Sequence, residues 1–173
     1  SELSAALKEA CLYDSLIIVE KGVLEAREIE CAVLGNDNPA VSVPGEIIPS
    51  REFYDFASKY LDGSSELIIP APLSGLQIQN IKRMAAAAYG ALQCRGMARV
   101  DFLLSKKNGK IYLNEVNTIP GFTSISMYPK LMEASGISYK DLIEELIRLA
   151  IAANKEKQKN VVSFERGSEW FKK

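Results

Sequence analysis

The stretch 97–117, MARVDFLLSKKNGKIYLNEVN, decides the fold of this chain. It holds two runs rich in branched and aromatic residues, 97–104 and 110–116, and each run predicts a β-strand. Asn108-Gly109 lies between them, and this dipeptide is a strong signal for the turn of a β-hairpin. The sequence therefore predicts an antiparallel hairpin here.

Segments on both sides of the hairpin extend the pattern. Residues 28–34 alternate apolar side chains with polar or small ones, as a strand with one buried face does. Ser74 and Gln77 have the spacing of a capping box, which predicts a helix that runs to about Cys94. Further strands are expected at 15–21, 41–48 and 67–69, and further helices at 1–13 and after Ser138. This order is typical of an α+β fold, with a mostly antiparallel sheet flanked by helices.

Composition excludes several classes of function. The 173 residues carry a net charge of -1, with 47% hydrophobic residues, so we expect a globular protein that binds no nucleic acid. The apolar runs are too short to cross a membrane. The sequence has no histidine and three widely spaced cysteines, which excludes imidazole chemistry and argues against a zinc site. Chemistry must therefore rely on carboxylates, Lys, Arg, Tyr, Ser and backbone amides.

The two strands of the hairpin carry four polar residues suited to a metal and a phosphate. Arg99 and Asp101 are two residues apart, as are Glu115 and Asn117, so each pair lies on one face of its strand. If Asp101 pairs with Glu115, all four side chains share a face. Carboxylate and amide oxygens are ligands that Mg²⁺ accepts, and arginine neutralises phosphate charge. Taken alone, the spacing favours the alternative interpretation, an Arg–Asp–Glu salt-bridge network on a solvated sheet face.

This arrangement makes a demand on the turn. Placing Asp101 opposite Glu115 requires an odd number of loop residues, such as 107–109 with Gly109 in the left-handed bulge position. A two-residue loop would pair Asp101 with Val116 and send the two carboxylates to opposite faces. The register of the hairpin therefore decides the metal hypothesis.

The segment after the hairpin makes the expectation more specific. Residues 113–126 read LNEVNTIPGFTSIS, and together with MARVD at 97–101 they resemble the signature of the D-alanine–D-alanine ligase family of ATP-grasp enzymes. The segment from Phe53 to Tyr60 resembles the mobile loop that covers the nucleotide in this family, and 19–21 resembles its adenine-binding hinge strand. The resemblance extends over about residues 5–155.

The resemblance implies a role for each candidate residue. Asp101, Glu115 and Asn117 would hold magnesium, as two ions, with Mn²⁺ as a substitute. Arg99 and the Gly121 amide would stabilise the tetrahedral intermediate and the phosphoryl group, and Ser126 with the Met127 amide would bind the carboxylate of the second D-alanine. Glu20, Lys21 and Val23 would contact the adenine of ATP, Glu28 the ribose, Lys59 a phosphate, and Tyr54 and Tyr60 would close the loop over the substrates.

Each role has a structural alternative. Glu20 and Lys21 could be an exposed strand end, Tyr54 and Tyr60 packing residues, Lys59 a solvated lysine, Ser126 a helix cap and Gly121 a residue that permits a tight turn. The stretch after Glu20 is one residue longer than in some family members. Leu24 therefore competes with Val23, and Glu25 with Glu28, although strand alternation favours Glu28.

The resemblance implies a division of the chain. Residues 1–28 would end the central lobe of an ATP-grasp fold, 29–155 would form its C-terminal lobe, and 156–173 would be a polar tail. The family's N-terminal domain and glycine-rich phosphate loop find no counterpart in the 173 residues. We therefore expect a fragment that is at best a weak nucleotide–metal binder alone, because catalysis by positioning needs all its groups.

The implied function is ATP-dependent joining of two D-alanines through a D-alanyl phosphate, for peptidoglycan synthesis in a bacterial cytoplasm. The expected partners are D-alanine, ATP, the missing N-terminal part and a second copy in a homodimer. Three alternatives stay open: a ligase that joins D-alanine to D-lactate or D-serine, another ATP-grasp ligase, and a non-catalytic interaction domain.

Overall fold

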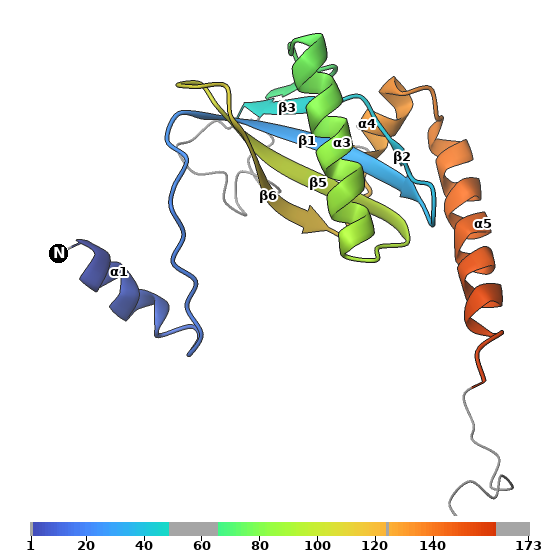
Figure 1. Ribbon diagram of the computed structural model, residues 1–173, viewed down its shortest axis with the longest axis horizontal. Coiled ribbons are helices and arrows are strands. Elements are labelled where there is room, and N and C mark those ends of the chain that lie inside the picture. The colour runs from blue at the N-terminus through green and yellow to red at the C-terminus, as the bar shows by residue number, and fades with distance from the viewer. Residues whose placement is uncertain (1, 49–65, 124, 162–173) are drawn as a thin grey trace, which may run out of the picture.

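The computed structural model describes residues 2–48, 66–123 and 125–161 (Figure 1). In chain order the elements are α1 (Glu2–Ala10), β1 (Ala26–Gly35), β2 (Ala40–Val41), β3 (Gly45–Ile48), β4 (Glu66–Ile68), α3 (Gly75–Ala91), β5 (Gly96–Ser105), β6 (Ile111–Asn117), α4 (Met127–Ala134) and α5 (Tyr139–Lys157). The strands form one sheet in the order β4-β3-β1-β5-β6, with β2 also paired to β1. Every pairing is antiparallel, which confirms the α+β expectation.

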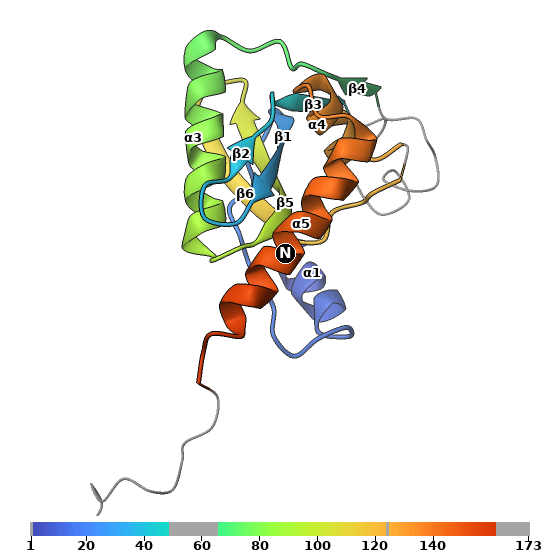
Figure 2. The same ribbon diagram turned by 90° about the vertical axis from the view of Figure 1, so that its right-hand side faces the viewer.

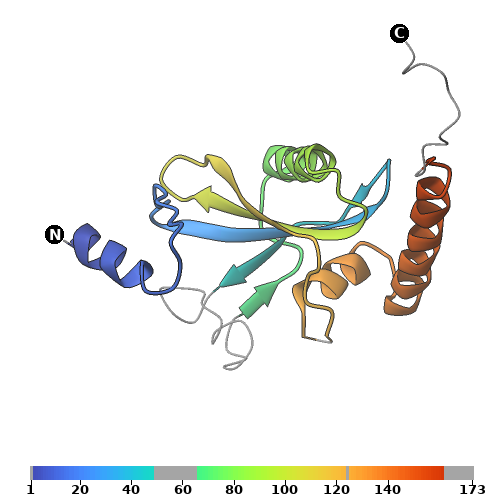
Figure 3. The ribbon, with the colours of Figure 1, turned by 90° about the horizontal axis from the view of Figure 1, so that it is seen from below.

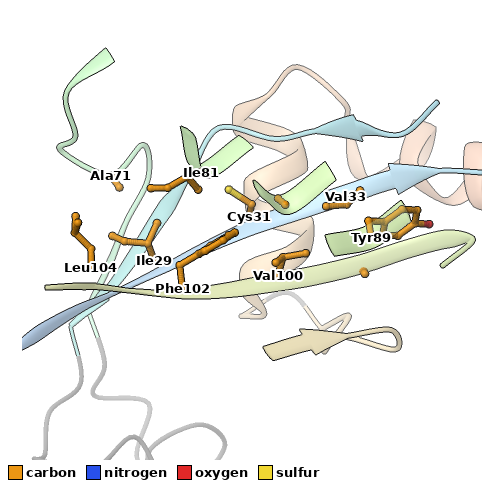
Figure 4. Packing of buried hydrophobic residues seen from close by; sticks show 11 residues of the cluster. Ile29, Cys31, Val33, Ala71, Ile81, Tyr89, Val100, Phe102 and Leu104 are labelled. Atoms are coloured by element: carbon orange, nitrogen blue, oxygen red, sulfur yellow. The ribbon is translucent and has the colours of Figure 1, made fainter. Parts of the chain in front are cut away.

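One face of the sheet is apolar and covered by α3 (Figures 2 and 4). Alternate residues of β1 and β5 point to this face, among them Ile29, Cys31, Val33, Val100 and Phe102, and they pack on Ile81, Ala85 and Tyr89 of α3. The helix begins where the sequence predicts, because Ser74 and Gln77 form both hydrogen bonds of a capping box. The Tyr89 hydroxyl donates to the carbonyl of Gly35 at 2.7 Å, which ties the end of α3 to the end of β1.

The opposite face is divided along its length. Ala32 and Leu34, near the end of β1, pack under α4 and α5, and the Tyr128 hydroxyl donates to the Val33 carbonyl at 3.1 Å. Glu28 and Glu30, nearer the start of β1, lie on the same face because alternate strand residues share a side. Figure 3 shows α3 on one side of the sheet and α4 on the other. The apolar part of this face is therefore covered by helices, while its polar part holds the candidate site.

The expected strand at residues 15–21 is wrong. These residues form an exposed extended connection between α1 and β1, with Leu16 80% and Ile18 79% exposed. An extended segment becomes a strand only when a neighbour satisfies its backbone groups, and no described strand pairs with it. Figure 1 shows α1 and this connection leading away from the sheet, and α1 buries no residue.

Two further elements differ from expectation. The single strand expected at 41–48 is split into β2 and β3, with Pro44 between them, since proline has no N–H for the ladder. The short helix α4 was not predicted. Pro129 obscures its helical pattern, although proline is tolerated in the first turn, where backbone N–H groups have no partner within the helix.

The expected division of the chain stays a prediction. Strand β1 begins at Ala26, so the proposed boundary after residue 28 lies inside a strand, and α5 ends at Lys157, inside the expected polar tail. Tyr54, Lys59, Tyr60 and the aromatics Trp170 and Phe171 lie outside the described residues. None of the helices within the described ranges combines the length and apolar character needed to span a bilayer.

Candidate active site

The hairpin brings the four candidate residues together. Asp101 of β5 pairs with Glu115 of β6, and Arg99 pairs with Asn117. Paired residues of antiparallel strands point to the same side, so all four side chains lie on the face that is opposite α3. Val116, between the two β6 residues, packs against the core under α3. The predicted convergence is confirmed.

The pairing of Asp101 with Glu115 is as predicted, but the three-residue loop that we expected to produce it is wrong. The Ser105 N–H donates to the Lys110 carbonyl at 3.0 Å, so four residues connect the strands rather than three. Gly109 has the predicted left-handed conformation, with φ of 67°. The turn sets Phe102 opposite Leu113, and a register shift between Asp101 and Phe102 then restores the required pairing.

Asn114 is the residue that the bulge absorbs. Without this extra residue in the ladder, the four-residue turn would place Asp101 opposite Asn114 and send Glu115 to the apolar face. The bulge therefore places the two carboxylates on the same face of the sheet. The residues of the turn alone do not predict this bulge.

Arg99 is held between two acidic groups. Its Nε and Nη2 donate to the two carboxylate oxygens of Asp101, both at 2.8 Å, and Nε lies 3.0 Å from Oε2 of Glu30. Burial raises the pKa of the Asp101 carboxyl, the hydrogen bond from Arg99 lowers it, and the neighbouring Glu115 raises it again; the net shift is upward. The site therefore favours a cation, because a cation relieves both the desolvation and the repulsion between the carboxylates.

The Asn117 amide bridges the two carboxylates. Its Nδ2 donates to Asp101 Oδ2 at 3.0 Å and to Glu115 Oε1 at 3.1 Å. Within the described residues, no three histidine, cysteine or acidic side chains form a metal cage, so the candidate ligands are two carboxylates and one amide. This oxygen-rich set fits Mg²⁺, which keeps several water and phosphate ligands, provided that the amide turns to present Oδ1.

Glu28 and Glu30 extend the acidic surface across β1. With Asp101 and Glu115 they line an open hollow of about 150 Å³. Glu25, the alternative to Glu28, lies in the turn before β1, where its carbonyl accepts from the Lys106 N–H. This placement supports Glu28 as the residue that faces a ligand.

Sequence reasoning missed Glu30. It is only 4% exposed, although glutamate is almost never buried without a partner. A signal was present in the sequence, because alternation places Glu30 on the same face as Glu28 and opposite Ile29 and Cys31. Its pairing with Arg99 was not visible, since the two residues lie far apart in the chain.

The loop after β6 brings Gly121 and Ser126 together. A side-chain Cβ at Gly121 would lie 2.9 Å from Ser126 Oγ, so a larger residue would displace this hydroxyl. Ser126 Oγ accepts from the Thr123 N–H at 3.0 Å and makes no side-chain cap to α4, although Ser126 is its N-cap residue. The Ser126 side chain thus does not cap α4, and the start of a helix attracts anions, which is consistent with the role expected for Ser126 and the Met127 amide.

The adenine candidates lie elsewhere. Glu20 and Lys21 are exposed and Val23 is partly buried in the connection before β1. None of the three lines the hollow beside Asp101. The described residues thus unite the metal, arginine and ribose candidates, whereas they leave the adenine candidates outside that cluster.

Comparisons with known proteins show the family of the chain. The family model described as D-ala D-ala ligase C-terminus matches residues 1–148. D-alanine–D-alanine ligases from Caldicellulosiruptor bescii and from Thermoanaerobacter sp. strain X514 are 60% and 57% identical to the chain over 157 residues, which are 91% and 90% of it. These matches cover 43% and 44% of the two relatives, so the chain spans less than half of their length.

Solved structures show the same relationship. The D-alanine–D-alanine ligase from Coxiella burnetii matches with a TM-score of 0.79 and 44% identity, over 91% of this chain and 41% of that one. The D-alanine–D-alanine ligase from Bacillus anthracis, solved with ATP, matches with a TM-score of 0.74 and 31% identity, over 90% of this chain and 49% of that one. The chain therefore belongs to the D-ala D-ala ligase C-terminus family and has the corresponding part of the ATP-grasp fold.

Proposed function

We propose that the protein joins two D-alanines with ATP, and that this chain supplies the magnesium ligands and part of the acceptor site. One observation carries the proposal: Arg99, Asp101, Glu115 and Asn117 share one face of the sheet. The named activity of relatives that are 52–60% identical supports it.

The cation would be held by Asp101, Glu115 and Asn117, as two Mg²⁺ ions or Mn²⁺ in their place. When bound, it neutralises charge on the phosphates of ATP. Arg99 contributes a fixed positive charge on the same face, and Asp101 orients that charge through its two hydrogen bonds. Glu28, which lines the hollow, would accept hydrogen bonds from the ribose hydroxyls.

Further groups would complete the nucleotide site. Glu20, Lys21 and Val23 would meet the adenine, Lys59 a phosphate, and Tyr54 and Tyr60 the closed loop. The Bacillus anthracis relative was solved with ATP, which supports ATP as the nucleotide. The requirement for ATP and D-alanine supports a cytoplasmic location.

The reaction would proceed in two transfers. The carboxylate of the first D-alanine takes the γ-phosphoryl group of ATP, and ADP leaves. The amine of the second D-alanine then attacks the carbonyl carbon of the acyl phosphate, so that the new amide bond forms as phosphate leaves and the amine loses a proton. Arg99 and the Gly121 amide would stabilise the oxyanion that forms at the attacked carbon. Ser126 and the Met127 amide would hold the carboxylate of the second D-alanine, since the start of α4 attracts anions.

Product analysis tests the proposal. The intact protein is incubated with ATP, MgCl₂ and D-alanine, and phosphate release and dipeptide are measured together. We expect one phosphate per D-alanyl-D-alanine and no dipeptide without Mg²⁺. ATP hydrolysis without dipeptide would contradict the assigned reaction.

A second candidate is a ligase that uses D-serine as acceptor. The D-Ala:D-Ser ligase VanG from Enterococcus faecalis matches with a TM-score of 0.74 and 40% identity over 86% of this chain. Competition between D-alanine, D-serine and D-lactate in one reaction separates the candidates by the mass of the product.

A non-catalytic interaction domain is tested by titration calorimetry with Mg–ADP, where no heat at millimolar ligand would favour it.

A homodimer is part of the proposal, supported by exposed Ile143, Ile147 and Ile151, which form an apolar stripe along α5. Molar mass from light scattering tests it.

A further inference from the structure

Glu30 is a buried acid that the proposed chemistry does not use. Its side chain is 5% exposed and lies on the site face of β1, directly across from Asp101 of β5. Burying a carboxylate costs several kcal/mol unless a cation compensates it. At this position the compensating group is Arg99, whose Nε lies 3.0 Å from Glu30 Oε2.

The same guanidinium also binds Asp101 through two hydrogen bonds of 2.8 Å, which engage both carboxylate oxygens. A cation that binds Asp101 therefore shares at least one carboxylate oxygen with Arg99, whose positive charge opposes its own. Without a second acidic partner, Arg99 would compete more strongly with the cation for Asp101, because opposite charges at this distance attract strongly in a partly buried site.

The order of the strands places the partner of Arg99 and the candidate ligands of the cation on opposite sides of Asp101. Glu30 lies on β1 and Glu115 on β6, and β5, which carries Asp101, lies between these two strands. Arg99 is thus anchored on the β1 side of Asp101, while the other candidate ligands of the cation lie on the β6 side.

We propose that Glu30 is a positioning residue, which holds the Arg99 guanidinium on the β1 side so that Asp101 and Glu115 remain available to the cation. This inference rests on the proposed function for the identity of the ligands. It assigns Glu30 no contact with substrate, and its action passes entirely through Arg99.

The first test is Glu30→Gln in the intact protein. Glutamine keeps the shape of the side chain and removes its charge, so Arg99 should bind Asp101 more tightly. The readout is the affinity for Mn²⁺ in the presence of ADP, followed by electron paramagnetic resonance of free Mn²⁺. We expect affinity to fall about 10- to 100-fold, as is usual when support of a metal site is lost. In turnover, kcat should fall with little change in KM for D-alanine.

Glu46→Gln is the matched control for stability. Glu46 is also buried and is bound by an arginine, with both Arg27 hydrogen bonds at 2.7 Å, but it shares the opposite face with Ile29. We expect Glu46→Gln to lower the melting temperature and to leave Mn²⁺ affinity unchanged. Glu30→Asp, which keeps the charge, should recover much of the affinity that Glu30→Gln loses.

A double-mutant cycle tests whether Glu30 acts through Arg99. In an Arg99→Gln background, Glu30→Gln should have no further effect on Mn²⁺ affinity. An equal loss in both backgrounds would show a direct effect on the cation and overturn the proposal, as would unchanged affinity in folded Glu30→Gln. Absence of Mn²⁺ binding by the unmodified protein overturns it too. If that protein makes no dipeptide but shows the expected cycle, the proposed function fails and the positioning role stands.

Discussion

Among single residues, the partners of the two site carboxylates differ sharply. Asp101 is buried and fully engaged by Arg99, whereas Glu115 lies on the more open strand β6. Replacing Asp101 would leave Arg99 with one acidic partner fewer in a buried place, which confounds loss of function with loss of stability. Glu115 is therefore the cleaner position at which to test the metal role.

Glu115→Gln should abolish ligation while the fold persists. The substitution removes one of two anionic ligands and keeps the volume of the side chain. Because electrostatic groups at a phosphoryl-transfer site are each worth about 10²–10³ in rate, we expect at least that loss in kcat. Steady-state kinetics and circular dichroism measure the two quantities, and near-normal turnover of a folded variant would contradict the assignment.

Cys31 predicts an alkaline dependence of stability. Burial raises the pKa of its thiol to about 12 from 9.0. Between these values the unfolded chain has lost the proton that the folded chain keeps. Stability from this group is complete below pH 9 and falls as pH rises toward 12, by up to about 1.36 kcal/mol per pH unit. The free energy of unfolding, measured with urea at several pH values between 9 and 12, should fall less steeply with pH for Cys31→Ala than for the unmodified protein. An equal dependence on pH in both proteins would refute Cys31 as the cause.

At the scale of elements, the starts of α3 and α5 were predictable, and for the hairpin the sequence predicted the register but not the turn that sets it. The capping box at Ser74 depends on residues three apart, so local sequence reveals it. The bulge at Asn114 depends on which faces of β6 meet the apolar core and the polar hollow. Which face of β6 meets the core depends on packing against α3 and on the neighbouring strands, including β1. The residues of the turn alone therefore do not predict the bulge.

Ser74→Ala should destabilise the protein without changing ligand binding. Ser74 Oγ accepts from the Gln77 N–H at 3.3 Å, and loss of such a cap costs about 1 kcal/mol. Since α3 covers the face opposite the site, Mg–ADP affinity should stay within about twofold. Urea denaturation and calorimetry measure the two effects, and a large loss of affinity would show coupling through the sheet.

Gly121→Ala tests the loop between β6 and α4. The added methyl group would meet Ser126 Oγ at 2.9 Å and turn this hydroxyl away. We expect a higher KM for the acceptor D-alanine, by about 10-fold as for a lost hydrogen bond to a charged group, with little change in melting temperature. Ser126→Ala is the comparison, and a change confined to KM for ATP would contradict the acceptor role.

For the molecule as a whole, the sheet and its helices form the folded body, and the first elements contribute little to it. Within residues 2–25 no side chain is buried, while apolar Leu12, Leu16 and Leu24 are more than three-quarters exposed. Exposed apolar surface of this kind is typical of a segment that packs against another part of a protein. It sets residues 2–25 apart from the sheet, whereas the expected boundary after residue 28 lies inside β1.

A variant that lacks residues 1–24 tests this separation. Among the described residues 2–24 it removes no buried side chain, and it keeps the hydrogen bond between the Glu25 carbonyl and the Lys106 N–H. We expect cooperative unfolding with a free energy within about 0.5 kcal/mol of the full 173 residues, as for surface changes. A loss of several kcal/mol would place these residues in the same folding unit as the sheet.

By itself, the sequence determined the antiparallel hairpin, the starts of α3 and α5 and the chemical types at the site, because alternation, turn residues and caps act over a few positions. Only the tertiary structure decided the bulge at Asn114, the pairing of Glu30 with Arg99 and the lack of any described strand beside residues 15–21. These features depend on which strand lies beside which. Strands far apart in sequence become neighbours through burial of the shared core, and no local pattern specifies that choice.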